Sequence, residues 1–547
     1  MTHTPRFLAA GALALLLASP SAALADVKMQ AIFGDHMVLQ QDLPIPVWGT
    51  ADYGEVVTVT VGADSAKATT GPDGKWAVKL QPLAGGAQPG TMTVAGKNTI
   101  TFQDVLVGEV WVCSGQSNME FNLGGAHNAQ TAIPAANDPQ MRLFRVRNVT
   151  AHTPAADVEG KWQVCVPDTA SGFTAVGYFF GKELRDKLKR PVGLIESNWG
   201  GTPAQAWTSL AGLEKDPVLA HFVDNWNQID ANYTKAMATY PTLKATSDKA
   251  IEEWNEKYGA QWNDMQRKWN EANAKAIAAK TSPPPRPELP APRPPDVQDP
   301  VGGPGAPASL YNGMIAPLQP FAIRGAIWYQ GEANAGAATE YRTLFPRMIK
   351  DWRETWGEGD FPFLWVQLAS FHADDSDNWP NLRDAQASTL SLPATGQATA
   401  IDIGLPDNIH PMDKLDVGKR LALGALHVAY GQDLVYAGPM FQAVKKDGNA
   451  LRVSYQDIGS GLKIGKSPWI GPGAHMLPED HLVGFEIAGV DNQWKPADAR
   501  IDGNVVVVSS GDVPAPVQVR YDWKSYPEGN LYNKEELPAT PFNAKVQ

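Results

Sequence analysis

The pattern of apolar and polar positions divides the chain into three regions. Short alternating runs at 45–48, 56–61, 76–80 and 91–94, bounded by glycine-rich turns, predict a small β-sandwich over residues 26–106. From residue 107 to 442, apolar strand-like runs alternate with segments of helical period, which predicts a parallel sheet flanked by helices. Strand texture returns over 443–547. The expected fold class is therefore α/β, with a β domain at each end.

The central region carries the elements on which the functional argument depends. We expect strands at 107–112, 192–198, 325–329, 363–368 and 398–403, and helices at 176–188, 341–356 and 414–430. Open α/β sheets place their chemistry at the carboxyl ends of the strands. Polar residues directly after these strands are therefore the candidates for function.

An insertion interrupts the central region over residues 211–305. Aromatic and Met side chains recur there at spacings of four, four, three and four, which predicts one stripe on a helix: Trp254, Tyr258, Trp262, Met265 and Trp269. We expect the stripe to pack against a partner helix or the body of the fold, with a sugar groove as the alternative. The proline-rich run that ends at Pro295 cannot be helical. The insertion is thus predicted to be a hairpin-like excursion with a stiff return.

The N-terminus predicts export to the periplasm or the medium. Residues 1–25 combine Arg6, an apolar stretch over 7–17 and a small-residue ending, the pattern of a secretory signal peptide. No later run reaches the ~18 apolar residues that a membrane span needs. A formal net charge of -12 argues against nucleic acid as a partner. Cys113 and Cys165 are the only cysteines, and they either pair or remain free thiols.

Ser117 is the strongest candidate for chemistry. The strand predicted at 107–112 leads into a sharp polar turn, Ser-Gly-Gln-Ser-Asn over 114–118, which places the Ser117 hydroxyl at the carboxyl edge of the sheet. The alternative is a serine- and asparagine-rich turn that only caps a helix.

Three later segments bring complementary groups to the same edge. The glycines Gly200 and Gly201 follow the strand at 192–198, so a backbone amide can point into a cleft there. Asn334 follows the strand at 325–329 and supplies a side-chain amide. Asp407 precedes His410 by three residues, and a carboxylate so placed can orient an imidazole whose other nitrogen faces a serine.

Together these motifs resemble an SGNH-type (GDSL-like) hydrolase, and more closely the sialate O-acetylesterase family. The matching blocks are Gly115–Met119, Trp199–Thr202, Gly331–Asn334 and Asp407–His410, with further similarity at 38–40, 310–315, 382–386 and 537–542. The resemblance spans nearly the whole chain after residue 25. It departs at the insertion and at Glu536, where a glycine is expected.

The resemblance implies a serine carbohydrate O-acetylesterase that forms an acetyl-enzyme. Ser117 would be the nucleophile, His410 the base and Asp407 the residue that orients it. The amides of Ser117 and Gly201 and the Asn334 side chain would form the oxyanion hole. No cofactor or metal is expected, because no histidine lies in an HExxH pattern and two cysteines offer no zinc cluster. The candidate substrate contacts are Gln116, Gly200, Glu332 and Arg383.

Several alternatives remain open at this stage. Glu332 with an aspartate could form a glycosidase pair, and a secreted β-rich chain could be a carbohydrate-binding protein without activity. Arg383 could pair with a sialic acid carboxylate or make a structural salt bridge. We favour acetylated plant-type oligosaccharides over sialic acid as substrate. The insertion would shape the substrate entrance or a homodimer contact.

Overall fold

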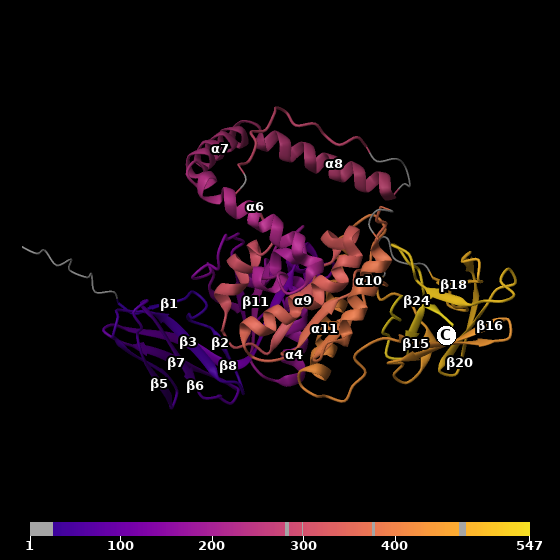
Figure 1. Cartoon of the computed structure of the whole chain (residues 1–547), viewed down its shortest axis with the longest axis horizontal. Coiled ribbons are helices and arrows are strands. Elements are labelled where there is room, and N and C mark those ends of the chain that lie inside the picture. Colours follow the sequence, from indigo (N-terminus) through magenta and orange to yellow (C-terminus); the bar gives the residue numbers. More distant parts are fainter. Residues whose placement is uncertain (1–25, 279–283, 298, 375–377, 470–476, 547) are drawn as a thin grey trace, which may run out of the picture.

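The computed structural model describes residues 26–278, 284–297, 299–374, 378–469 and 477–546. Figure 1 shows three bodies in a row, with a helical arm rising from the middle one. The signal peptide predicted at residues 1–25 lies outside the described residues. Within the described ranges, no helix is both long and apolar enough to cross a membrane.

The middle body is built on a twisted, mostly parallel sheet. Its strand order is β10-β9-β11-β8-β12-β13-β14, and only the edge strand β10 runs antiparallel to its neighbour. The strands are β8 (Thr99–Gly115), β9 (Asp138–Arg145), β10 (Trp162–Cys165), β11 (Val192–Asn198), β12 (Gly325–Tyr329), β13 (Phe363–Val366) and β14 (Thr395–Ala398). The mixed α/β fold predicted from the sequence is confirmed at this level.

Helices cover both faces of this sheet. Trp111 on β8 packs against Phe180 of α4 (Ala175–Leu188) with ring centroids 5.0 Å apart, and α4 packs on α11 (Lys414–Val428). Trp328 on β12 packs against Trp352 of α9 (Ala338–Trp356), with centroids 5.9 Å apart, and α9 packs on α10 (Trp379–Ser388). Trp328 pairs in register with Ser114, so it faces the opposite side from Trp111.

The N-terminal β domain is joined to the middle body by one continuous strand. The first half of β8 pairs with β7, and its second half pairs with β11 and β12. The predicted boundary at residue 106 therefore falls inside β8. The other strands of this domain are β1 (Lys28–Met29), β2 (Val38–Gln40), β3 (Ile45–Thr50), β4 (Val56–Val61), β5 (Asp64–Thr69), β6 (Lys75–Leu80) and β7 (Gly86–Ala95).

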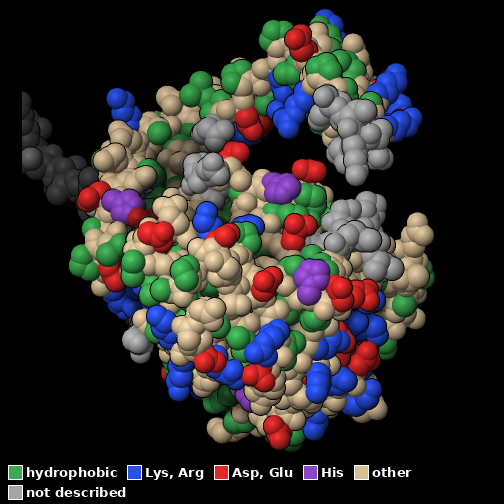
Figure 2. Space-filling model, turned by 90° about the vertical axis from the view of Figure 1, so that its right-hand side faces the viewer, with side chains coloured by type: hydrophobic (Ala, Val, Ile, Leu, Met, Phe, Trp, Pro, Cys, Tyr) green, Lys and Arg blue, Asp and Glu red, His purple; other side chains and the backbone are tan. Residues whose placement is uncertain are grey.

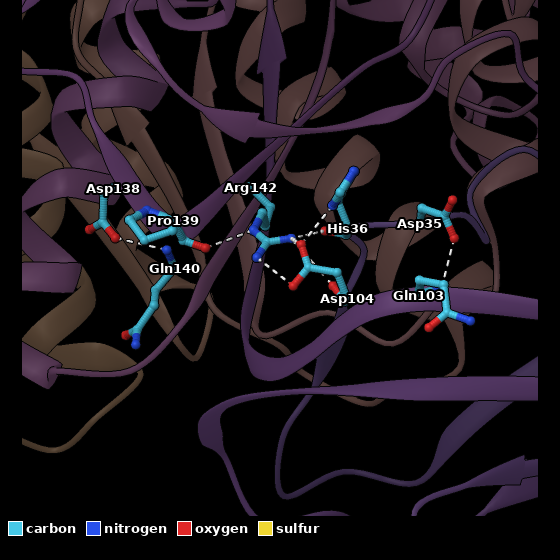
Figure 3. Close-up of polar contacts among 8 residues, drawn as sticks. All are labelled: Asp35, His36, Gln103, Asp104, Asp138, Pro139, Gln140 and Arg142. Carbon is cyan, nitrogen blue, oxygen red and sulfur yellow. Dashed lines mark hydrogen bonds and ion pairs between the residues drawn. The ribbon is translucent and has the colours of Figure 1, made fainter.

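An ion pair reinforces the same junction (Figure 3). Arg142, buried on β9, donates to both carboxylate oxygens of Asp104 at 2.7 and 3.1 Å. The His36 ring contacts the same carboxylate at 2.6 Å. Partial burial raises the pKa of Asp104, but the hydrogen bonds from Arg142 and His36 outweigh burial and hold it below its ordinary value. A bidentate pair of this kind fixes how the two bodies meet.

The C-terminal β domain has its own hydrophobic core. It begins at Met440, three residues before the predicted boundary, and contains β15 (Met440–Asp447), β16 (Ala450–Gln456), β17 (Leu462–Ile464), β18 (Phe485–Ala488), β19 (Lys495–Pro496), β20 (Asp498–Asp502), β21 (Val505–Ser509), β22 (Gln518–Tyr521), β23 (Leu531–Asn533) and β24 (Phe542–Lys545). Glu536, where the family pattern leads us to expect glycine, has a φ of 66°. That conformation favours glycine, which explains the expectation.

One predicted strand is shifted. Instead of spanning 398–403, the last sheet strand is β14, which ends at Ala398. The chain then turns, because buried Asp402 accepts hydrogen bonds from both terminal nitrogens of Arg420 on α11, each at 2.7 Å. Satisfying this buried ion pair takes precedence over extending the apolar run.

The insertion forms the arm. It consists of α6 (Ala220–Met237), α7 (Tyr240–Trp254), a π-helical turn (Asn255–Gly259) and α8 (Ala260–Ala278), followed by the proline-rich return. The indole of Trp254 donates to the carbonyl of Ala291, and that of Trp269 to Pro284. The stripe therefore packs at these points against the arm's own return, instead of the partner helix or body that we expected. In Figure 2 the arm stands over the body across an open space.

We predict that the outer arm is dispensable for cleaving a small ester. Lys244 Nζ lies 3.6 Å from Asp296 Oδ1, so a short Gly/Ser linker can replace residues 245–295 and leave α6 in place. The shortened protein should hydrolyse p-nitrophenyl acetate at the wild-type rate and lose activity on acetylated oligosaccharides. A folded deletion protein that fails on the small ester would show that the arm belongs to the catalytic machinery.

Candidate active site

A strained turn presents Ser117. Gly115 ends β8 with a φ of 136°, and a Cβ at this position would lie 2.2 Å from the carbonyl oxygen of Tyr329. Only glycine fits, so the chain can turn sharply between two parallel strands. Ser117 then begins the short helix α1 (Ser117–Glu120) and is half-buried at the carboxyl edge of the sheet.

The structure brings Ser117 and His410 together across 293 positions of sequence. His410 Nε2 lies 2.8 Å from Ser117 Oγ, within hydrogen-bonding distance. Burial, and then the nearby ammonium of Lys414, lower the pKa of the His410 imidazole. A neutral imidazole in this position can accept the serine proton.

Asp407 does not contact the His410 ring. Its side chain is 70% exposed, and its carboxylate lies 4.0 Å from Nδ1 of His372. The loop instead holds His410 by its backbone, because Asn408 Oδ1 accepts from the His410 amide at 2.9 Å. The role of Asp407 as the orienting carboxylate therefore stays a prediction.

The two glycines differ in what their amides do. The Gly200 amide donates to Glu120 Oε2 at 2.7 Å, and a Cβ on Gly200 would lie only 3.3 Å from Ser117 Cβ. Gly201 has a φ of 75° and open space beside it, and its amide has no acceptor among the described residues. Glu120 thus occupies one amide and leaves the next one free beside the serine.

Asn334 has a fixed amide orientation. Its Oδ1 accepts from the Ala204 amide at 2.9 Å and from Gln330 Nε2 at 2.6 Å, while its Nδ2 donates to Gln205 at 3.1 Å. Because the oxygen already has two donors, the NH₂ group cannot exchange places with it. One N–H of Asn334 has no partner among the described residues.

Two of the predicted substrate contacts are bonded to the framework, and a substrate contact by the Gln116 amide nitrogen stays a prediction. Gln116 is buried, and its Oε1 accepts from the amides of Gly331 and Ala333, which ties the serine turn to the next loop. Arg383 is fully buried and donates to four backbone carbonyls, those of Leu368, Ala369, Lys524 and Ser525. The guanidinium is therefore not placed to bind a substrate carboxylate, and its partners are carbonyls instead of an acid.

Glu332 points inward. Its Oε1 accepts from Asn118 Nδ2 at 2.6 Å, and its Oε2 is buried without a hydrogen-bond partner in the described ranges. Burial raises the pKa of this carboxyl. This position fits neither a substrate contact nor half of a glycosidase pair, because both would need the carboxylate to face the substrate.

Sequence reasoning missed three residues beside the serine: Asn118, Glu120 and Lys414. Asn118 and Glu120 lie within the serine motif, so their position was the available signal. The only signal for Lys414 was its position, because it is a cationic residue in the first turn of a helix, where the helix dipole disfavours positive charge. The two cysteines, which either pair or stay free on sequence grounds, are both free and buried.

Comparison with known proteins identifies the family. The family model described as carbohydrate esterase, sialic acid-specific acetylesterase matches residues 107–273 and 303–427. The chain belongs to this family. It is therefore a carboxylic ester hydrolase, and a non-catalytic carbohydrate-binding role no longer accounts for it.

Relatives match along almost the whole chain. A sialate O-acetylesterase of Rattus norvegicus is 29% identical over 95% of this chain and 94% of its own length, and that of Homo sapiens is 27% identical over 98% and 95%. The crystal structure of a carbohydrate acetylesterase from Xanthomonas citri superimposes with a TM-score of 0.74 at 36% identity, covering 95% of this chain and all of that one.

We predict that Arg383→Gln lowers stability without changing substrate binding. Only the carbonyls of Leu368 and Lys524 lack another donor among the described residues. Each one left without a donor costs about 1–3 kcal/mol, so the free energy of unfolding should fall by about 2–6 kcal/mol. Urea unfolding measures this loss, and KM for an acetylated sugar should not change. A stable variant whose KM rises would instead place Arg383 on the substrate.

Proposed function

We propose that this esterase is a serine carbohydrate O-acetylesterase working through an acetyl-enzyme. The observation that carries the proposal is the 2.8 Å contact between Ser117 Oγ and His410 Nε2 at the carboxyl edge of the sheet. The sequence blocks follow the order of an SGNH-type hydrolase, and they lie in the loops after β8, β11, β12 and β14 at this edge of the sheet. We also propose that the protein is exported, because residues 1–25 have the pattern of a secretory signal peptide.

The reaction follows from these groups. His410 takes the Ser117 proton as Oγ attacks the acetyl carbonyl carbon, giving a tetrahedral oxyanion. Collapse breaks the bond to the sugar oxygen, which leaves with the proton from His410. A water molecule then gives its proton to His410 and attacks the acetyl-serine, and the second collapse releases acetate and returns the proton to Ser117.

Three donors would hold the oxyanion: the amides of Ser117 and Gly201 and the Asn334 side chain. Gly201 is a better candidate than Gly200, because the Gly201 amide has no acceptor among the described residues and the Gly200 amide already donates to Glu120. Asn334 has a spare N–H and a locked orientation, the preorganisation that such a donor needs. Removing one donor of this kind typically costs about 3–4 kcal/mol of transition-state stabilisation.

Asp407 would complete the triad if its side chain turned from His372 towards the free ring nitrogen of His410. In the described conformation the serine–histidine pair stands without a carboxylate on the ring. We therefore assign the proton transfer to His410 and the orienting role of Asp407 to a second conformation of its loop.

We infer acetylated neutral oligosaccharides of plant type as the substrates. The carbohydrate acetylesterase from Xanthomonas citri is more similar in sequence than the mammalian sialate O-acetylesterases, at 36% against 27–29% identity. Arg383, which the sequence left as a candidate partner for a sialate carboxylate, is buried. The net charge of -12 also disfavours an anionic substrate.

Ser117→Ala should abolish acetate release and leave the fold intact, because a hydroxyl in a turn contributes little packing. Acetate release is measured on acetylated xylo-oligosaccharides and on O-acetylated sialic acid side by side, and the neutral sugar should be the better substrate. Asp407→Asn in the same assay tests whether Asp407 belongs to the triad. A kcat equal to that of the wild type would mean that only Ser117 and His410 transfer the proton. A folded Ser117→Ala protein with normal turnover would refute the serine mechanism.

Asn334→Asp should lower kcat by about 10²–10³, with little change in KM. The aspartate keeps an oxygen for the Ala204 and Gln330 donors, removes the N–H donor and adds a negative charge, so the loss should be at least that of a missing donor. Steady-state kinetics with thermal unfolding as the control separate this effect from instability. A change confined to KM would make Asn334 a sugar-binding residue.

A further inference from the structure

A buried polar cluster lies beside the Ser117–His410 pair. Asn118 Nδ2 donates to Glu332 Oε1 at 2.6 Å and to the backbone carbonyl of Ile409 at 2.9 Å. Asn118 Oδ1 accepts from Lys414 Nζ at 2.5 Å. Both Asn118 and Lys414 have no exposed surface. The carbonyl that Asn118 holds belongs to the residue directly before His410.

Lys414 is an unusual residue to find at this place. Its Nζ lies 4.9 Å from the ring centroid of Phe121 and 5.2 Å from that of Tyr329. Its one hydrogen-bond acceptor within the described ranges is Asn118 Oδ1. An ammonium is costly to bury without a carboxylate in contact, and a methionine would fill the same space without that cost.

The contacts show what the ammonium does. With Lys414 on its oxygen, the Asn118 amide cannot flip, because its NH₂ group would then face a cation. The NH₂ group is therefore committed to Glu332 and Ile409, and the Ile409 carbonyl fixes the start of the His410 backbone. Removal of the ammonium leaves the buried Asn118 Oδ1 without a donor, so that only the two bonds from Nδ2 still hold the amide.

We propose that Lys414, acting through Asn118, is a positioning residue that seats the His410 ring on Ser117. This inference rests on the proposed serine mechanism. It adds a residue that touches neither substrate nor reacting atoms.

The electrostatics agree with this geometry. Burial lowers the pKa of Lys414 to about 7, against the opposing effect of Glu332 and Asp413, the charged groups facing it from the loop after β12 and from the helix N-cap. Asp413 in turn faces Asp416 and His127. Below pH ~7 the charged ammonium disfavours protonation of His410, so the base stays active at lower pH. Without the ammonium, the pKa of His410 should rise.

Lys414→Met tests the proposal, with Lys419→Met as the matched control, because Lys419 is exposed on the same helix. For p-nitrophenyl acetate we expect Lys414→Met to lower kcat about tenfold to a hundredfold, the range of small misplacements, with KM unchanged. The acid limb of the kcat/KM profile should move to higher pH. Lys419→Met should follow the wild-type profile.

A folded Lys414→Met protein with wild-type kcat and an unmoved acid limb would overturn the inference about Lys414. The serine mechanism is tested separately, because an inactive Ser117→Ala protein supports it whatever Lys414→Met does. If Lys414→Met does not fold, Asn118→Asp decides, since it keeps the acceptor for Lys414 and removes the donors to Ile409 and Glu332. Unchanged kinetics in that variant would also overturn the inference.

Discussion

One buried amide group connects the segments that carry the candidate chemistry. Asn118 bonds to partners 214, 291 and 296 positions away in sequence, which lie in the loop after β12, in the histidine loop and in the first turn of α11. A primary amide offers two donors and an acceptor in one plane, and all are used here. Because buried polar groups must be paired, satisfying Asn118 sets how these three segments meet beside Ser117.

This arrangement has a cost in stability. The Lys414 side chain and the Glu332 carboxylate are both buried, and no direct ion pair joins them within the described residues. Burial raises the pKa of Glu332 above its unfolded value, so its destabilising effect grows as pH rises through that range. Burial lowers the pKa of Lys414 to about 7, so its effect grows as pH falls from its unfolded pKa of ~10.4 towards 7. Both effects act near neutral pH, where the fold gives up stability for a defined electrostatic environment.

The sequence was most informative where the signal was local. The strands at 192–198 and 325–329 occur as predicted, because apolar runs and the motifs that follow them are adjacent in sequence. Burial of Arg383 and Glu332 was not predictable, since charged side chains are usually exposed and their partners come from distant segments. Periodicity gave the aromatic face of the arm helix but not its partner, because a repeat defines a face and says nothing of what covers it.

The C-terminal β domain takes part in building the site. Its Ser525 carbonyl accepts from the Phe371 amide and from Arg383, and Tyr526 packs its ring 4.6 Å from that of His372. His372 is the residue whose ring Asp407 approaches. A contact between domains therefore helps to place the partner of Asp407. This explains why a local Asp-x-x-His pattern does not by itself bring the carboxylate onto the His410 ring: the position of Asp407 depends on a neighbour held by a domain more than a hundred residues further along the chain.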